Sequence, residues 1–193
     1  RAATGNISIF AGTERSTFDK VLPVLKTIGR RVLHTGPLGT ASILKVMTNY
    51  LASINLAALG ESLMTMKRAG IDLNTTYEAI RISSGNSFVH ETESQVILNG
   101  SRDINFTMEL VVKDLTLFQS IADRENIPLD ISPLLLSIFK DGQERYGGHE
   151  WSPNIVRRLE DACGDRLLAP GFPEEIIDSE PEIAGEEVVP RKG

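Results

Sequence analysis

Apolar residues recur at helical spacing along most of the chain, and this pattern predicts a mainly α protein. From Thr40 to Ala69 nothing interrupts the periodicity except Gly60, and apolar residues occur on most sides of the predicted helix. Such a helix is typically central and buried. The same spacing, bounded by cap residues, glycines and prolines, predicts further helices over residues 75–82, 87–98, 106–126, 132–146 and 152–163.

A different pattern precedes the long helix. Residues 6–11 alternate polar and apolar side chains, as in a short strand, and residues 30–34 form a second such segment. Between them lies a helical repeat that Gly29 ends, so residues 6–34 have the size of one βαβ unit. Two strands do not make a stable sheet alone. We expect them either to pair with strands outside this chain or to be strained edge elements.

Residues 165–193 change in character. They hold eight acidic and three basic residues together with four prolines. This composition argues against a packed domain. We interpret the segment as an acidic, Pro-rich, disordered tail. An acidic docking segment is the less favoured alternative.

Bulk composition narrows the function. Of the 193 residues, 41% are hydrophobic and 24% charged, as in ordinary globular proteins, and the net charge of -6 argues against a general nucleic-acid binder. No apolar run reaches the roughly 18 residues that a membrane span needs. The single cysteine fits a reducing compartment, and the three histidines lack metal-ligand spacing. We therefore expect a cytoplasmic protein without metal, membrane or nucleic acid. Because residue 1 is Arg, we also expect an N-terminally truncated piece, whose targeting signal would be lost.

The segment that suggests chemistry runs from His34 to Asn49, with the sequence H-T-G-P-L-G-T-A-S-I-L-K-V-M-T-N. Gly36, Pro37 and Gly39 form a turn that leads into the long helix. Lys45 and Asn49 lie four residues apart and so share one helical face. An amine beside an amide, among small residues, suits an oxygen-rich small molecule. The alternative is a solvated lysine and a tolerated polar residue.

This stretch resembles the glycine–lysine–asparagine signature of the β-hydroxyacid dehydrogenase family, which includes 3-hydroxyisobutyrate dehydrogenase, tartronate semialdehyde reductase and 6-phosphogluconate dehydrogenase. The resemblance covers roughly residues 4–163. It implies the helical C-terminal domain of a 6-phosphogluconate-dehydrogenase-like fold after the end of a Rossmann domain. The implied domains are a Rossmann remnant over residues 1–36, a helical dimerisation and substrate domain over 37–164, and the tail over 165–193.

The resemblance also implies roles for individual residues. Lys45 would be the catalytic general acid/base, and Asn49, Ser84 and Gly85 would bind substrate. The stretch F-T-M-E-L-V-V-K-D-L is similar to the family's Lys-Asp-Leu segment across the active-site cleft. Lys113 would therefore bind the cofactor, together with Gly36 and Gly39. Without the resemblance, Lys113-Asp114 would be a solvated pair, and residues 84–85 are equally well explained as a helix connector.

The implied function is hydride transfer between NAD or NADP and a small β-hydroxyacid, by a homodimer or homotetramer. No G-x-G-x-x-G fingerprint is present, so the cofactor site would be incomplete in this chain, and NAD versus NADP stays open. Two alternatives remain. One is an imine-reductase-like enzyme of the same fold, which Lys45 and Asn49 argue against. The other is a non-catalytic helical dimerisation module, which would not need Lys45, Asn49 and Lys113 to come together.

Overall fold

The chain forms two compact units. The computed structural model describes residues 1–178 and 180–191. Unit 1 comprises Arg1–Met47 together with the C-terminal residues from Ile177 on, and unit 2 comprises Thr48–Ile176. These boundaries differ from the 36/37 and 164/165 that the sequence suggested. Residues 37–41 pack beneath the end of the first strand, and residues 165–176 pack on unit 2.

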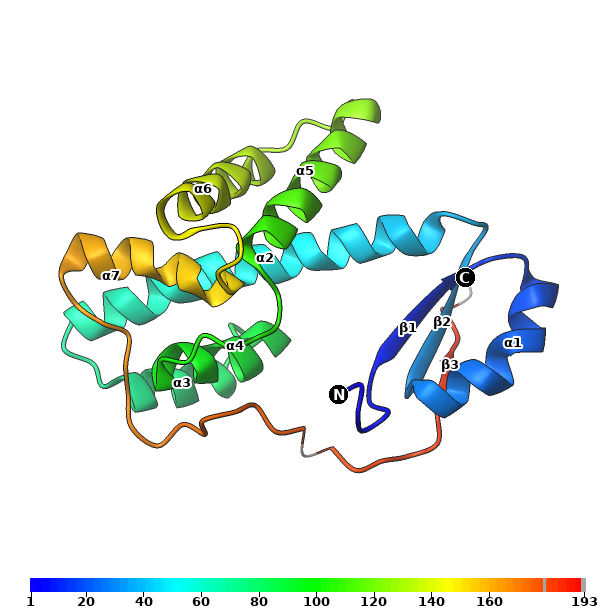
Figure 1. Ribbon diagram of the computed structural model, residues 1–193, viewed down its shortest axis with the longest axis horizontal. Helices are drawn as coiled ribbons and strands as arrows, with labels where there is room; N and C mark the ends of the chain where they lie inside the picture. Colours follow the sequence, from blue (N-terminus) through cyan, green and yellow to red (C-terminus); the bar gives the residue numbers. More distant parts are fainter. Residues whose placement is uncertain (179, 192–193) are drawn as a thin grey trace. The chain divides into compact units, whose positions relative to one another are not determined.

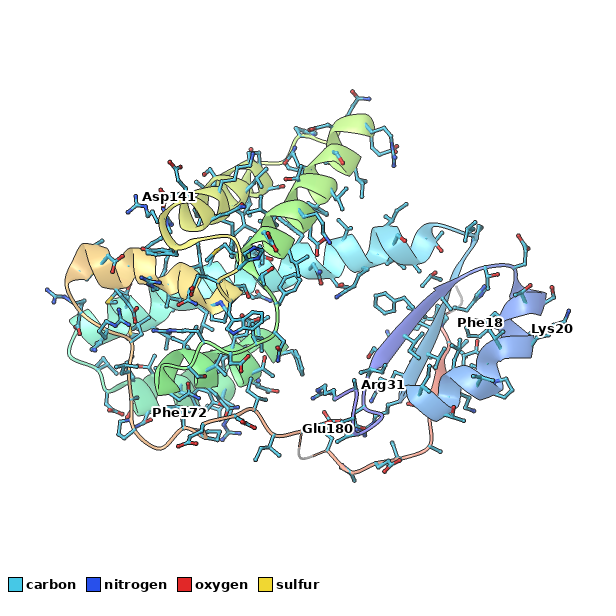
Figure 2. All side chains as sticks on the ribbon, viewed as in Figure 1. Phe18, Lys20, Arg31, Asp141, Phe172 and Glu180 are labelled. Atoms are coloured by element: carbon cyan, nitrogen blue, oxygen red, sulfur yellow. The ribbon has the colours of Figure 1, made fainter. Side chains whose placement is uncertain are left out.

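Unit 1 is a small parallel sheet with one helix. It contains β1 (Ser8–Gly12), α1 (Arg15–Ile28), β2 (Arg31–Gly36) and β3 (Glu186–Val188), in the sheet order β1-β2-β3. The predicted strand–helix–strand unit is confirmed, because β1 pairs in parallel with β2 and α1 connects the two strands. Figure 2 labels Phe18 on α1, where its side chain is fully buried. The Phe18 ring centroid lies 4.8 Å from that of His34 in β2.

Unit 2 is helical, as the apolar periodicity predicted. The long helix α2 (Thr40–Arg68) enters it at Thr48. There follow α3 (Leu73–Arg81), α4 (Phe88–Asn99), α5 (Met108–Arg124), α6 (Ile131–Tyr146), a 3-10 turn η1 (Ser152–Val156) and α7 (Arg157–Cys163). Figure 1 shows α5 and α6 side by side, and they are in contact. Local chemistry sets the ends: Asp72 and Ser87 accept backbone N–H groups at the starts of α3 and α4.

The core of unit 2 gathers around α2. Buried apolar side chains come from α2 (Leu56, Leu59, Leu63, Met64), α4 (Val89, Ile97), α5 (Val111, Leu115), α6 (Leu135, Phe139) and η1 (Ile155, Val156). Gly60 permits a close approach, since a Cβ there would lie 2.9 Å from Val156. By length and composition alone α2 could cross a membrane. Its packing as the helix around which this core forms is equally typical of a globular protein.

The tail differs from the disordered extension that its composition suggested. Leu167 is fully buried in the core of unit 2, and Phe172 packs edge-on against Tyr77 (Figure 2). Farther on, β3 pairs with β2. The tail's acids meet basic partners there, as in the Glu187–Arg15 ion pair. Composition counts charges but does not reveal such partners, which explains the difference.

Candidate functional site

The glycine turn between β2 and α2 is shaped by backbone conformations that favour glycine. Gly36 has a φ of +106° and Gly39 a φ of +96°, both in the left-handed region. The Thr40 hydroxyl donates to the Pro37 carbonyl at 2.7 Å and so closes the turn. Beneath it, a Cβ on Gly12 would lie 3.0 Å from the Pro37 oxygen. The end of β1 can therefore pack against the turn only without a side chain.

Lys45 lies in unit 1, in the part of α2 that follows this turn, and its side chain is exposed. Asn49 follows four residues later on the same continuous helix, so the two positions share a helical face as predicted. Asn49 is half-buried and belongs to unit 2.

In unit 2 the predicted residues Asn49 and Lys113 both contact the carboxylate of Asp114. The Asn49 side-chain amide donates a hydrogen bond from Nδ2 to Asp114 Oδ2 at 2.5 Å. The other carboxylate oxygen, Oδ1, lies 3.2 Å from Lys113 Nζ. Next to this group, the Tyr50 and Phe118 rings stack with centroids 4.0 Å apart. The predicted substrate amide and the predicted cofactor lysine therefore share one carboxylate between α2 and α5.

Ser84 and Gly85 lie in an exposed turn between α3 and α4. The Gly85 amide donates to the Ser83 hydroxyl at 3.2 Å, and Ser87 caps α4 through the His90 amide. These bonds give the segment a defined conformation. A role in substrate binding stays a prediction, alongside the equally weighted reading as a connector.

A separate apolar groove of about 670 Å³ lies between α2 and α3. Ala58, Ser62, Met66, Ile71 and Ile80 are among its lining residues. None of the predicted site residues lines it. We locate the candidate site at Asn49, Lys113 and Asp114 instead, because there an amide and an ammonium group from two different helices meet at one carboxylate.

The sequence alone did not identify Asp114 as the partner of Asn49. It placed the residue beside Lys113, in what would otherwise be an ordinary solvated pair. The pairing depends on the register between α2 and α5, whose contacting residues are 65 positions apart. Glu93 was also missed, although it lies four residues from both Val89 and Ile97 on the buried face of α4. Burial raises the pKa of Glu93 to about 8.

Comparison with known proteins gives a consistent result. Residues 39–159 match a family described as NAD-binding of NADP-dependent 3-hydroxyisobutyrate dehydrogenase. The chain is 30% identical to 2-(hydroxymethyl)glutarate dehydrogenase of Eubacterium barkeri, over 84% of this chain and 54% of that protein. It is 26% identical to L-threonate dehydrogenase of Escherichia coli K12, over 81% and 52%.

A solved structure shares the fold. It is a 3-hydroxyisobutyrate dehydrogenase from Salmonella typhimurium, which aligns with a TM-score of 0.75 and 26% identity, over 81% of this chain and 55% of that one. The chain thus spans about half the length of the curated relatives it matches.

Proposed function

Since the chain belongs to the NADP-dependent 3-hydroxyisobutyrate dehydrogenase family, we propose that it is part of an NAD(P)-dependent oxidoreductase that acts on a small β-hydroxyacid. Unit 1 then contributes the end of a Rossmann sheet and unit 2 the helical domain. The observation that carries the proposal is the Asn49–Asp114–Lys113 group, whose Asn49 follows Lys45 by one helical turn. Amide and ammonium groups suit the carboxylate and hydroxyl of such a substrate.

The residues present fit the nicotinamide end of a dinucleotide. A Cβ on Gly39 would meet nothing within 4 Å, so the backbone of the turn is open to a ligand. The Lys113 side chain is 57% exposed and offers a cation. The sequence has no G-x-G-x-x-G for a pyrophosphate. We assign cofactor contact to Gly36 and Gly39 within unit 1, and contact with the nicotinamide–ribose part to Lys113 within unit 2.

In this proposal Lys45 transfers the proton, and Asn49 orients the substrate. A bound nicotinamide would supply the hydride acceptor for oxidation of the carbinol carbon and the hydride donor for the reverse reaction. During oxidation Lys45 would take the hydroxyl proton, and during reduction Lys45 would give a proton to the carbonyl oxygen. Asn49 holds the substrate by its oxygen atoms, so that this proton lies within reach of Lys45.

We further propose a homodimer or homotetramer, assembled through the helical unit. The exposed apolar side chains of α2 support this proposal, among them Leu51 at 49% and Met66 at 36% exposure. Exposed apolar side chains gathered on one helix are typical of a surface that binds another protein chain. A cytoplasmic location agrees with the lone cysteine, Cys163, which has no second cysteine to pair with.

The first test is cofactor binding. NADH and NADPH fluorescence should be titrated against the protein as its gene encodes it, and against the variant Lys113→Met. We expect Kd to rise about 10-fold in Lys113→Met, because a charge-assisted contact is lost. Lys140→Met, a lysine change on α6, is the control and should leave Kd unchanged. Failure of the unaltered protein to bind either nucleotide would contradict the dehydrogenase assignment.

A further inference from the structure

We propose that Asp114 is the positioning residue of this site: its carboxylate fixes the Asn49 amide in one orientation and holds Lys113 beside it. The inference deepens the proposed function and rests on it for the identity of the ligand. It gives a task to a residue that neither the family description nor the relatives' names assign. Asp114 acts through Asn49 and Lys113, so it need not touch substrate itself.

The geometry divides the carboxylate between two partners. Oδ2 accepts from Asn49 Nδ2 at 2.5 Å, and Oδ1 faces Lys113 Nζ at 3.2 Å. The Asp114 side chain is only 10% exposed, whereas that of Lys113 is 57% exposed. A buried carboxylate needs such partners, because desolvation without them costs several kcal/mol. The partly buried amide and the exposed ammonium therefore have one common anchor.

The anchor determines what Asn49 presents to a ligand. The two ends of an asparagine amide are nearly isosteric, and a neutral environment can accept either orientation. An ionised carboxylate accepts hydrogen bonds but donates none, so it bonds only the amide nitrogen. Asn49 Oδ1 must then point away from Asp114, beside the remaining N–H.

Other contacts hold the helices together without the carboxylate. The Tyr50 and Phe118 rings stack at an interplanar angle of 9° between α2 and α5. Ser53 donates to the Asn49 carbonyl oxygen at 2.8 Å within α2. On α5, Val111 and Leu115 are buried on either side of Asp114. Removal of one charge should therefore disturb the amide more than the fold, so the two effects can be separated.

The test compares Asp114→Asn, which keeps the shape and removes the charge, with Asp114→Glu, which restores a carboxylate. The control is Asp123→Asn on the same helix, where the aspartate side chain accepts from Gln119 Nε2 at 2.8 Å. We expect Asp114→Asn to lower kcat/KM for β-hydroxyacids about 10- to 100-fold, the loss expected for a charged hydrogen bond. Asp114→Glu should recover part of this loss, and Asp123→Asn should behave as wild type.

A second measurement does not depend on turnover, and its main result comes from the unaltered protein, so a variant that fails to fold does not affect it. In the unaltered protein, NMR should detect a scalar coupling across the hydrogen bond from Asn49 Nδ2 to the Asp114 carboxyl carbon, with one Asn49 side-chain proton slow to exchange. In Asp114→Asn that coupling and the slow exchange should disappear. An unaltered protein without the coupling, or an Asp114→Asn variant with the kinetics of Asp123→Asn, would overturn the inference. An enzyme inactive on hydroxyacids that still shows the coupling would instead contradict the proposed function.

Discussion

At the scale of single residues, the chain contains a carboxyl group in an unusual environment. Glu93 lies on the buried face of α4, and its Oε2 is buried without a hydrogen-bond partner among the described residues. Desolvation disfavours the charged form and raises the pKa of Glu93 from 4.5 to about 8. Between these values the folded protein binds a proton that the unfolded chain releases. This group's contribution to stability is therefore full below pH 4.5 and is lost as the pH rises to about 8.

Replacement of this residue tests that pH dependence. Glu93→Gln should raise the free energy of unfolding at pH 9 by on the order of 3 kcal/mol, because the amide carries no charge to desolvate. At pH 4 the same change should have little effect. Urea denaturation across this range measures both, with the exposed Glu144→Gln as control. A gain that does not depend on pH would show that the Glu93 carboxyl does not titrate with folding.

The candidate residues were predictable to different degrees. Lys45, Asn49 and Lys113 could be proposed as site residues because short-range spacing and a recognisable signature surround them. The bond from Asn49 to Asp114 could not, since it depends on how two helices align in space. From the residue types and their opposite charges alone, Lys113 and Asp114 resemble an ordinary ion pair on a protein surface.

At the scale of elements, periodicity and caps located the helices to within a few residues, but they did not reveal β3. Its sequence Glu-Glu-Val is short and charged, so it has no apolar alternation to detect. Its position depends on β2, on the Arg15–Glu187 ion pair and on Asp178, which accepts hydrogen bonds from Thr4 and Asn6. These two bonds lower the pKa of Asp178 to about 2.

Gly185 offers a direct test of how β3 docks. It is buried, and a Cβ there would lie 2.3 Å from the Gly29 carbonyl oxygen and 2.4 Å from that of Lys26. Since both are backbone atoms that cannot move aside, Gly185→Ala should displace β3. Hydrogen exchange should then lose protection in β2 by about 10-fold or more. Gly85→Ala, where the nearest atom is 3.5 Å away, is the control. Unchanged protection in Gly185→Ala would contradict this packing.

At the scale of the whole molecule, the sequence established a βαβ unit followed by helices, and both are present. It did not establish where the units divide, because that depends on contacts rather than on composition. Residues 37–47 and the segment that contains β3 both belong to the compact unit that holds the sheet. Each unit thus contributes predicted residues: unit 1 has the glycine turn and Lys45, and unit 2 has Asn49, Asp114 and Lys113.

We propose that Lys45 performs proton transfer in a hydroxyacid dehydrogenase, and turnover of Lys45→Ala tests this role most directly. The protein as its gene encodes it should be assayed with NAD and NADP against L-threonate, 2-(hydroxymethyl)glutarate and 3-hydroxyisobutyrate. We predict that kcat falls about 10²- to 10⁴-fold while cofactor affinity is kept, and that added methylamine restores part of the rate. Lys20→Ala, on α1, should match wild type. Equal turnover by Lys45→Ala and Lys20→Ala would contradict the account.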